Sequence, residues 1–119
     1  MTTYRAAAYT RVTNSEHASE RLADQERQIR QWAEQNGCEV VDVYADIGSG
    51  ITDQRPGLER LVADARAGAF DIVVVAEPSR LFRNLGLLQQ CCDQLRDELG
   101  VAVSAVEPCD GCQYAGWLR

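Results

Sequence analysis

The uninterrupted apolar run at residues 71–76 (DIVVVA) restricts the fold of this chain more than any other feature. A short run rich in β-branched residues, without alternating polar positions, is typical of a strand that is buried on both faces. Such strands occur almost only in parallel sheets whose two faces are covered by helices. The run therefore predicts an α/β fold built around a central parallel strand.

Strand-like and helix-like segments alternate along the rest of the chain. β-favouring apolar segments predict strands, and apolar residues at helical spacing predict helices that end at glycines. The predicted strands are residues 4–12, 39–46, 71–76 and 101–106, and the predicted helices are about 20–36, 56–67 and 81–99. We expect Ser19 to cap the first helix and Pro56 to begin the second. This alternation predicts a three-layer domain, a mainly parallel sheet of about four strands flanked by helices.

The length of 119 residues fits one domain with a single core. We assign residues 1–106 to this domain and residues 107–119 to a tail. The sequence has no apolar run of membrane-spanning length and no secretory leader, so we expect a cytoplasmic protein without membrane contact. Its five cysteines are an odd number, which favours reduced thiols over a disulfide framework.

The net charge of -6 argues against a nucleic-acid partner, because neutralisation of phosphates normally supplies much of the affinity for DNA. The distribution of the positive charge points the other way. All twelve basic residues are arginine, and four of them lie at predicted segment ends and loops: Arg11, Arg55, Arg80 and Arg83.

Ligands of open parallel sheets bind beyond the carboxyl ends of the strands. Residues 11–15, 46–55 and 77–83 lie at the ends of three predicted strands, so we expect them to converge at one edge. The first segment lacks the G-x-G-x-x-G pattern of a dinucleotide site, and Gly48-Ser49-Gly50 lacks the Gly-Lys-Ser/Thr of a P-loop. Arginines around hydroxyl residues instead suit metal-free phosphodiester exchange, since guanidinium groups offset the negative charge of the reacting phosphate.

A series of short motifs makes this interpretation specific. In chain order they are residues 9–13 (YTRVT), 24–25 (DQ), 44–50 (YADIGSG), 55–58 (RPGL), 80–84 (RLFRN) and 107–110 (EPCD) with Ala115-Gly116. They resemble motifs of the serine recombinase catalytic domain: Y-x-R-V-S, Y-x-D-x-G-x-S-G with one residue fewer between Asp and Ser, R-P-G-L, D-R-L-S-R-N and E-P-I-D…A-G. The similarity covers almost the whole chain. It implies a resolvase-like, flavodoxin-like domain that cleaves and rejoins DNA at specific sites by metal-free transesterification, without a cofactor.

The resemblance also implies a role for individual residues. Thr13 occupies the position of the nucleophile, whose hydroxyl attacks the DNA phosphorus. By the same resemblance, Arg11, Arg80 and Arg83 hold the scissile phosphate, and Arg55 assists from the glycine-rich loop. Three further polar residues are expected to orient arginines or stabilise the site: Gln25, Asp46 and Asp71.

Two departures from the family pattern leave a second hypothesis open. Thr13 replaces the usual serine, and Ser79 stands where the family usually has aspartate. Threonine is a competent nucleophile when activated, but its methyl group restricts the side chain and crowds the attacking oxygen. Ser15 lies nearby, although its spacing from Arg11 does not match the motif. The alternative function is a catalytically silent recombinase-like module for oligomerisation or regulation.

The resemblance implies DNA and further copies of the chain as partners. Family members form dimers and tetramers through a long helix that follows this domain, and they hold DNA with an additional C-terminal module. The present chain ends at Arg119, where that helix is expected to begin. We therefore expect the isolated acidic domain to bind DNA weakly.

Cys109 and Cys112 form a C-x-x-C pair, which suggests a third possibility, a zinc- or thiol-dependent regulator. A redox pair belongs at the start of a helix after an early strand, whereas this pair follows the last predicted strand. Zinc would need two more ligands. The only further ligands that the sequence offers are Cys38, Cys91, Cys92 and His17, none of which forms a second ligand pair of zinc-site spacing. We therefore expect no metal.

Overall fold

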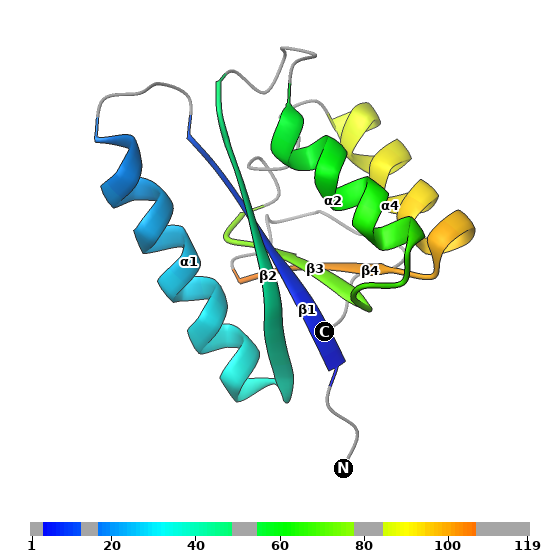
Figure 1. Cartoon of the computed structure of the whole chain (residues 1–119), viewed down its shortest axis with the longest axis horizontal. Coiled ribbons are helices and arrows are strands. Elements are labelled where there is room, and N and C mark those ends of the chain that lie inside the picture. Colours follow the sequence, from blue (N-terminus) through cyan, green and yellow to red (C-terminus); the bar gives the residue numbers. More distant parts are fainter. Residues whose placement is uncertain (1–3, 13–16, 49–54, 78–84, 107–119) are drawn as a thin grey trace.

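The computed structural model describes residues 4–12, 17–48, 55–77 and 85–106, without the side chains of Leu85, Leu87 and Leu88. Strands and helices alternate as predicted, and most boundaries differ from the prediction by one or two residues. In order, the elements are β1 (Tyr4–Val12), α1 (Ala18–Gln35), β2 (Cys38–Ile47), α2 (Pro56–Arg66), β3 (Ile72–Val75), α4 (Leu85–Leu99) and β4 (Ala102–Ala105). Figure 1 shows this arrangement.

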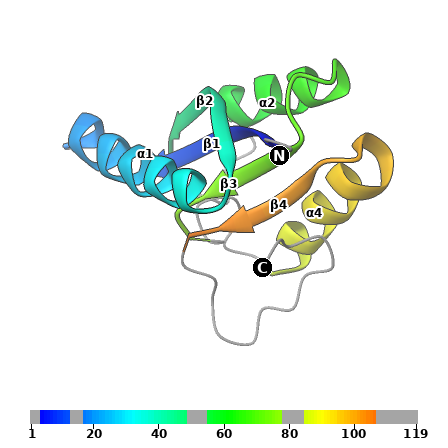
Figure 2. The same cartoon turned by 90° about the horizontal axis from the view of Figure 1, so that it is seen from below.

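The four strands form one sheet in the order β2-β1-β3-β4, and all neighbouring strands are parallel. β3 pairs with β1 on one side and β4 on the other, and all four of its residues are buried. Figure 2 shows β3 between its two neighbours, with α4 alongside β4. The expected α/β fold with a buried parallel strand is confirmed. The run is apolar because a strand that is paired on both sides and covered on both faces has no contact with water.

Helices cover both faces of the sheet and complete the three layers. Ile29 of α1 packs on one face, in a cluster with Ala6, Ala8, Ile72 and Val74. Leu61 of α2 and Leu95 of α4 pack on the other face. Figure 1 shows α1 alone on one side of the sheet and the α2–α4 pair on the other. Among the described residues, no helix is both apolar enough and long enough to cross a membrane.

The start of α1 differs from the prediction. The helix begins at Ala18, and His17 in a left-handed conformation (φ 55°) occupies the cap position, so the expectation that Ser19 caps the helix is wrong. Ala18 is buried on the same helix face as Gln25 and Ile29. Burial of one more residue against the core thus outweighs the preference of serine for a cap, which is worth only about 1 kcal/mol.

A bulge in β2 determines which of its side chains face each helix layer. Ala6 pairs with Val40 and Ala7 pairs with Asp42, so Val41 has no counterpart on β1. An extra residue reverses the side-chain alternation of a strand from that point on. Val40 before the bulge and Val43 after it therefore both pack toward α1.

The same bulge turns the carboxyl half of β2 toward α2. Tyr44 packs in the cluster with Leu61 of α2, and Asp46 contacts the first residues of that helix. Asp46 also becomes the register partner of Arg11 on β1. The bulge thus brings two charged residues of the predicted site to one edge and one face of the sheet.

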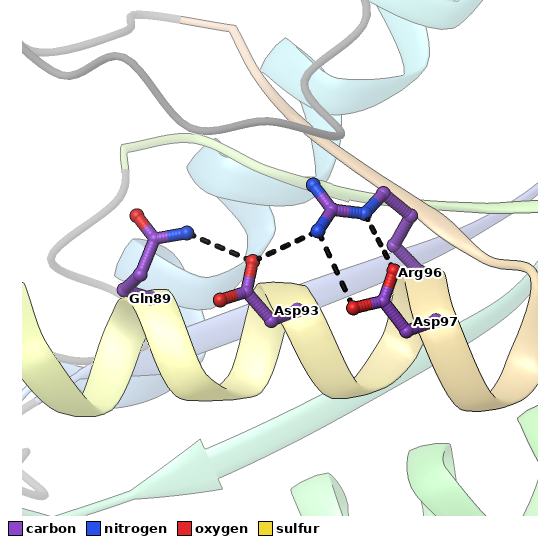
Figure 3. A network of polar contacts seen from close by, with 4 residues as sticks. All are labelled: Gln89, Asp93, Arg96 and Asp97. Atoms are coloured by element: carbon purple, nitrogen blue, oxygen red, sulfur yellow. Dashed lines mark hydrogen bonds and ion pairs between the residues drawn. The ribbon is translucent and has the colours of Figure 1, made fainter.

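The outer surface of α4 carries a local polar network. Asp93 accepts hydrogen bonds from the Gln89 amide (2.8 Å) and from Nη2 of Arg96 (3.3 Å), while Nε of Arg96 donates to Asp97 (3.0 Å). Figure 3 shows these contacts, all within the one helix. Pairs three or four residues apart stabilise a helix by a few tenths of a kcal/mol each. These contacts of Arg96 are therefore local to α4.

Candidate active site at the carboxyl edge of the sheet

Arg11 lies near the carboxyl end of β1 and is 1% exposed. Its Nη1 donates a hydrogen bond to the carbonyl oxygen of Gly48, which follows β2, at 2.8 Å. Its backbone is held by Gln25 of α1: the Arg11 N–H donates to Gln25 Oε1 (3.1 Å), and Gln25 Nε2 donates to the Arg11 carbonyl (2.9 Å). Gln25 thus holds the main chain of Arg11 through these bonds.

Asp46, near the end of β2, is a buried carboxylate with three donors around it. It accepts hydrogen bonds from the backbone N–H groups of Gly57 (2.7 Å) and Leu58 (2.9 Å), and from the Tyr9 hydroxyl (2.7 Å). The first two are N–H groups of the first turn of α2, which no residue within the helix can satisfy. The residue at the cap position, Arg55, supplies no side-chain cap. Asp46 therefore caps α2 from the neighbouring strand, where the helix dipole favours a negative charge.

Gly57 permits this close approach of α2 to β2. A Cβ atom at this position would lie 2.5 Å from the Ala45 carbonyl oxygen and 3.0 Å from Cγ of Asp46. Real Cβ atoms essentially never approach a backbone oxygen that closely. The glycine of the R-P-G-L motif is thus required by packing at the site.

Arg55 lies at the start of α2 and is only 4% exposed. Its Nε and Nη2 both donate to the Tyr9 hydroxyl oxygen, at 3.2 and 2.7 Å. The guanidinium carbon also lies 5.3 Å from the centre of the Tyr9 ring, within the range of a cation–π contact. Arg55, the residue directly before α2, is thus buried against β1.

Tyr9 connects these groups and remains protonated. Burial and the hydrogen bond to Asp46 raise the pKa of Tyr9 above its usual value of 10.0, and the nearby Arg55 opposes this only in part. A neutral phenol both donates one hydrogen bond and accepts others. Tyr9 therefore bridges the carboxylate of Asp46 and the guanidinium of Arg55.

Asp71 is placed away from the other predicted site residues. Its carboxylate accepts hydrogen bonds from the backbone N–H (3.0 Å) and from Nε (3.4 Å) and Nη2 (3.1 Å) of Arg5, near the beginning of β1. These bonds lower the pKa of Asp71. The prediction that Asp71 orients an arginine of the site is wrong. It precedes a parallel strand, and therefore lies at the amino edge of the sheet.

Several predicted site residues lie outside the described part of the chain. They are Thr13, Ser15, Ser79, Arg80 and Arg83, together with Cys109 and Cys112. Of the described candidates at the carboxyl edge, the structure links Arg11 with Gln25, and Asp46 with Arg55 through Tyr9. The register pairing of Arg11 with Asp46 joins the two groups.

A small polar pocket adjoins the Gln25 side of this site. Its volume is about 270 Å³, and it lies between α1 and the end of β3. Its lining residues are Arg21, Asp24, Gln25, Gln28, Ala76 and Glu77. The mixture of charges gives the pocket no clear preference for an anion or a cation.

The described residues offer no metal centre and no activated thiol. They contain no group of three or more histidine, cysteine or acidic residues that could hold a metal ion. The three cysteines among them, Cys38, Cys91 and Cys92, are free. Burial raises the pKa of Cys91 to about 11 and that of Cys92 to about 12, so these two thiols are protonated at neutral pH.

Sequence reasoning missed Tyr9 and Gly57 as members of the site. Both lie in motifs that were recognised, but neither carries a charge or a nucleophile. A signal was present for Tyr9, because a tyrosine in a strand buried on both faces needs a partner for its hydroxyl. The requirement for Gly57 depends on how closely α2 approaches β2, which has no local signature in the sequence.

The architecture defines the class of this protein: a doubly wound α/β domain with polar residues gathered at the carboxyl edge of a parallel sheet. Comparison with known families makes the assignment specific, because residues 6–112 match the family described as Resolvase, N terminal domain. The chain belongs to this family, and its catalytic domain is of the serine recombinase type.

Solved structures of serine recombinases are similar to this chain over most of its length. The C-terminal catalytic domain of ISC1926 TnpA, an IS607-like serine recombinase, is 29% identical with a TM-score of 0.78, covering 89% of this chain and 72% of that one. The N-terminal catalytic domain of TP901-1 integrase is 28% identical with a TM-score of 0.75, covering 86% of this chain and 76% of that one. A resolvase family site-specific recombinase from Streptococcus pneumoniae is 25% identical with a TM-score of 0.73, covering 87% of this chain and 72% of that one.

Proposed function

We propose that this domain catalyses site-specific cleavage and rejoining of DNA by transesterification, with the hydroxyl of Thr13 as the nucleophile. The Thr13 oxygen attacks the scissile phosphorus while the bond from phosphorus to the DNA 3′ oxygen breaks. The hydroxyl proton passes to solvent, and the departing oxygen takes up a proton. The products are a 5′-phosphothreonyl link and a free 3′ hydroxyl. Attack by another 3′ hydroxyl on the phosphorus rejoins the DNA, breaks the bond to the Thr13 oxygen and restores the Thr13 hydroxyl. Each phosphodiester bond that breaks is replaced by another, so the reaction needs no external energy source.

The observation that carries this proposal is the anchoring of Arg11. This arginine precedes Thr13 by two positions, and both its backbone and its guanidinium are held at the carboxyl edge by Gln25 and Gly48. A guanidinium fixed before the substrate arrives stabilises developing negative charge without reorganisation during the reaction. In the proposed site, Arg80 and Arg83 join Arg11 on the scissile phosphate.

Gln25, Asp46 and Arg55 act less directly in this proposal. Gln25 holds the end of β1, and Asp46 fixes the beginning of α2. Arg55 adds positive charge behind the phosphate-binding arginines. The reaction needs no cofactor in this scheme, since the arginines supply the charge that a metal ion would otherwise supply.

The proposed partner is DNA, bound by a dimer or tetramer of the full protein. The domain itself carries a net charge of -6, and exposed arginines such as Arg27 and Arg30 form ion pairs with acidic residues of the same helix. Weak DNA binding by the isolated domain follows from this balance, because affinity for DNA depends mainly on uncompensated positive charge.

The test joins this domain to the oligomerisation helix and DNA-binding module of a serine recombinase. Three versions are compared: unaltered, Thr13→Ser and Thr13→Ala. Each is incubated with a nicked suicide substrate, which traps the cleaved state, and covalent protein–DNA adduct is measured on a denaturing gel. We expect adduct from the unaltered and serine proteins and none from the alanine variant. Adduct from the alanine variant would exclude Thr13 as the nucleophile.

The sequence favours one second candidate, a catalytically silent recombinase-like module. Its basis is the combination of Thr13 at the nucleophile position with Ser79 in place of aspartate. Adduct from the Thr13→Ser protein alone would support this module, because it would show that the site is intact but that threonine does not react. An Arg11→Ala version of the serine protein is the matched control and should give no adduct.

A further inference from the structure

The hydroxyl of Tyr9 has every hydrogen-bonding position occupied by a group of the candidate site. Tyr9 is fully buried on β1, two residues before Arg11. Its hydroxyl donates to Asp46 Oδ2 at 2.7 Å and accepts from Nη2 and Nε of Arg55 at 2.7 and 3.2 Å. A phenol offers one donor and two acceptor positions, so this oxygen is saturated by two site residues.

The two partners depend on the phenol to different degrees. Asp46 keeps its hydrogen bonds from the backbone of Gly57 and Leu58 when the phenol is removed. Arg55, in contrast, directs two of its donors at this one oxygen. The hydroxyl therefore receives two donors of the guanidinium, whereas it is one of three donors to the carboxylate.

The charges explain why a neutral group stands between the two ions. A buried guanidinium is costly unless it is hydrogen-bonded and compensated by an opposite charge. The carboxylate of Asp46 polarises the Tyr9 hydroxyl, because a phenol that donates to a carboxylate becomes a stronger acceptor on its other side. The polarised oxygen attracts the guanidinium of Arg55 more strongly. The ring contact at 5.3 Å adds a second attraction in the same direction.

We propose that Tyr9 is a positioning residue for the strand-transfer reaction, which orients Arg55 through its hydroxyl. This inference rests on the proposed function, in which Arg55 supplies positive charge to the phosphate site. Tyr9 itself does not touch the substrate. Its phenol holds the guanidinium at the junction of β1, β2 and α2.

The test uses Tyr9→Phe, which keeps the ring and its contact with Arg55 but removes the hydroxyl. Tyr44→Phe is the matched control. Tyr44 is the register partner of Tyr9 on β2 and is also buried. Its hydroxyl also donates to a carboxylate, that of Asp64, and Oδ2 of Asp42 lies 3.3 Å from the same hydroxyl oxygen. The two variants therefore remove the same group from the same sheet, and Tyr9→Phe removes the hydroxyl that accepts hydrogen bonds from Arg55.

The first measurement is the exchange of the Arg55 Nε proton with water, followed by heteronuclear NMR of the full chain without DNA. The signal is assigned from its disappearance in Arg55→Lys. We expect exchange to become about tenfold faster or more in Tyr9→Phe, because the Nε proton loses its acceptor. Exchange should remain unchanged in Tyr44→Phe. An unchanged Arg55 signal in Tyr9→Phe overturns the proposal.

The second measurement is the rate of adduct formation in the joined recombinase described above, with position 13 either unaltered or carrying Thr13→Ser, whichever cleaves faster. We expect Tyr9→Phe to slow cleavage about tenfold, Tyr44→Phe to leave it unchanged, and Tyr9→Phe to add nothing in a protein that already carries Arg55→Ala. Slowing that persists in the absence of Arg55 overturns the proposal, because the phenol would then act by another route.

The two measurements separate this inference from the proposed function. Faster exchange of the Arg55 Nε proton in Tyr9→Phe, with no cleavage by any Thr13 or Thr13→Ser protein, supports the placement of Arg55 by Tyr9 and overturns the recombinase activity. Cleavage by the parent together with an unchanged rate in Tyr9→Phe supports the activity and overturns the positioning role.

Discussion

Burial separates the arginines of this protein into two groups. Arg27 and Arg30 are exposed and pair with acidic residues one turn away on α1. Arg11 and Arg55 are buried at the carboxyl edge and are held by partners distant in sequence, Gly48 and Tyr9. Exposed pairs of the first kind contribute at most about 1 kcal/mol to stability. Burial of a guanidinium is costly unless hydrogen bonds or opposite charges compensate it. The buried arginines, Arg11 and Arg55, are therefore the candidates for function.

The contact between α2 and β2 gives the first residue-scale prediction. Gly57→Ala places a methyl group 2.5 Å from the Ala45 carbonyl oxygen, so α2 must move away from β2 and from Asp46. We expect a loss of about 3 kcal/mol in the free energy of unfolding, measured by urea denaturation. Gly68→Ala is the control. It meets no atom within 4 Å but has a positive φ of 76°, and we expect a loss of about 1 kcal/mol from backbone strain alone. Equal losses would contradict the steric explanation.

At the scale of elements, Gln25 completes the hydrogen bonding of β1. The pairing of β1 with β3 ends at Tyr9 and Val75, two residues before Arg11. The backbone N–H and carbonyl of Arg11 therefore extend beyond the strand that would otherwise pair with them. The side-chain amide of Gln25 supplies one acceptor and one donor there, and so takes the place of the missing strand. In this way α1 holds the end of β1 that leads to Thr13.

A substitution in α1 tests this arrangement. Gln25→Leu leaves the buried N–H and carbonyl of Arg11 without these partners, and we expect a loss of about 2–3 kcal/mol in unfolding free energy together with faster hydrogen exchange of the Arg11 amide. Gln28→Leu, at an exposed position of the same helix, should change stability by less than about 0.5 kcal/mol. If the Arg11 amide exchanges equally slowly in both variants, Gln25 does not hold this strand end.

At the scale of the whole molecule, the amino edge of the sheet carries a structural contact and the carboxyl edge carries the candidate site. The amino edge carries the contact between Arg5 and Asp71, which joins the beginnings of β1 and β3. The carboxyl edge carries Arg11, Asp46 and Arg55, the described charged residues of the candidate site. Parallel strands make this division possible, because all of their carboxyl ends lie together.

The amino-edge contact predicts a specific pH dependence. Hydrogen bonds from Arg5 lower the pKa of Asp71 below 3.8, so the folded protein favours the ionised carboxylate. The resulting stability is fully present above the pKa of the unfolded chain and is lost as the pH falls through the lower pKa of the folded state. Because Asp71 is 42% exposed, we expect Asp71→Asn to cost no more than about 1 kcal/mol at neutral pH.

The measurement is the unfolding free energy of the parent protein and Asp71→Asn as a function of pH. The difference between the two should be constant near neutrality and shrink on acidification below the unfolded pKa. A difference that grows on acidification would contradict the sign of the shift.

Local patterns in the chain were sufficient to predict the order of strands and helices. The run at residues 71–76 identified the buried strand, since apolar content and turn signals act over a few residues. The motifs likewise single out Arg11, Gln25, Asp46 and Arg55, all of which lie at the carboxyl edge of the sheet. The amino-edge position of Asp71 was also accessible, because the direction of a parallel strand follows from chain order.

The contacts among these residues depended on packing between segments far apart in the chain. The bulge at Val41 is invisible in the sequence of β2, because it exists only relative to the pairing with β1. Without it, alternation would direct Asp46 toward α1, away from Tyr9 and the start of α2. Local propensities therefore specified the elements, whereas the relative register of two strands and the close approach of one helix assembled the candidate site, since those depend on surfaces that meet only in the folded chain.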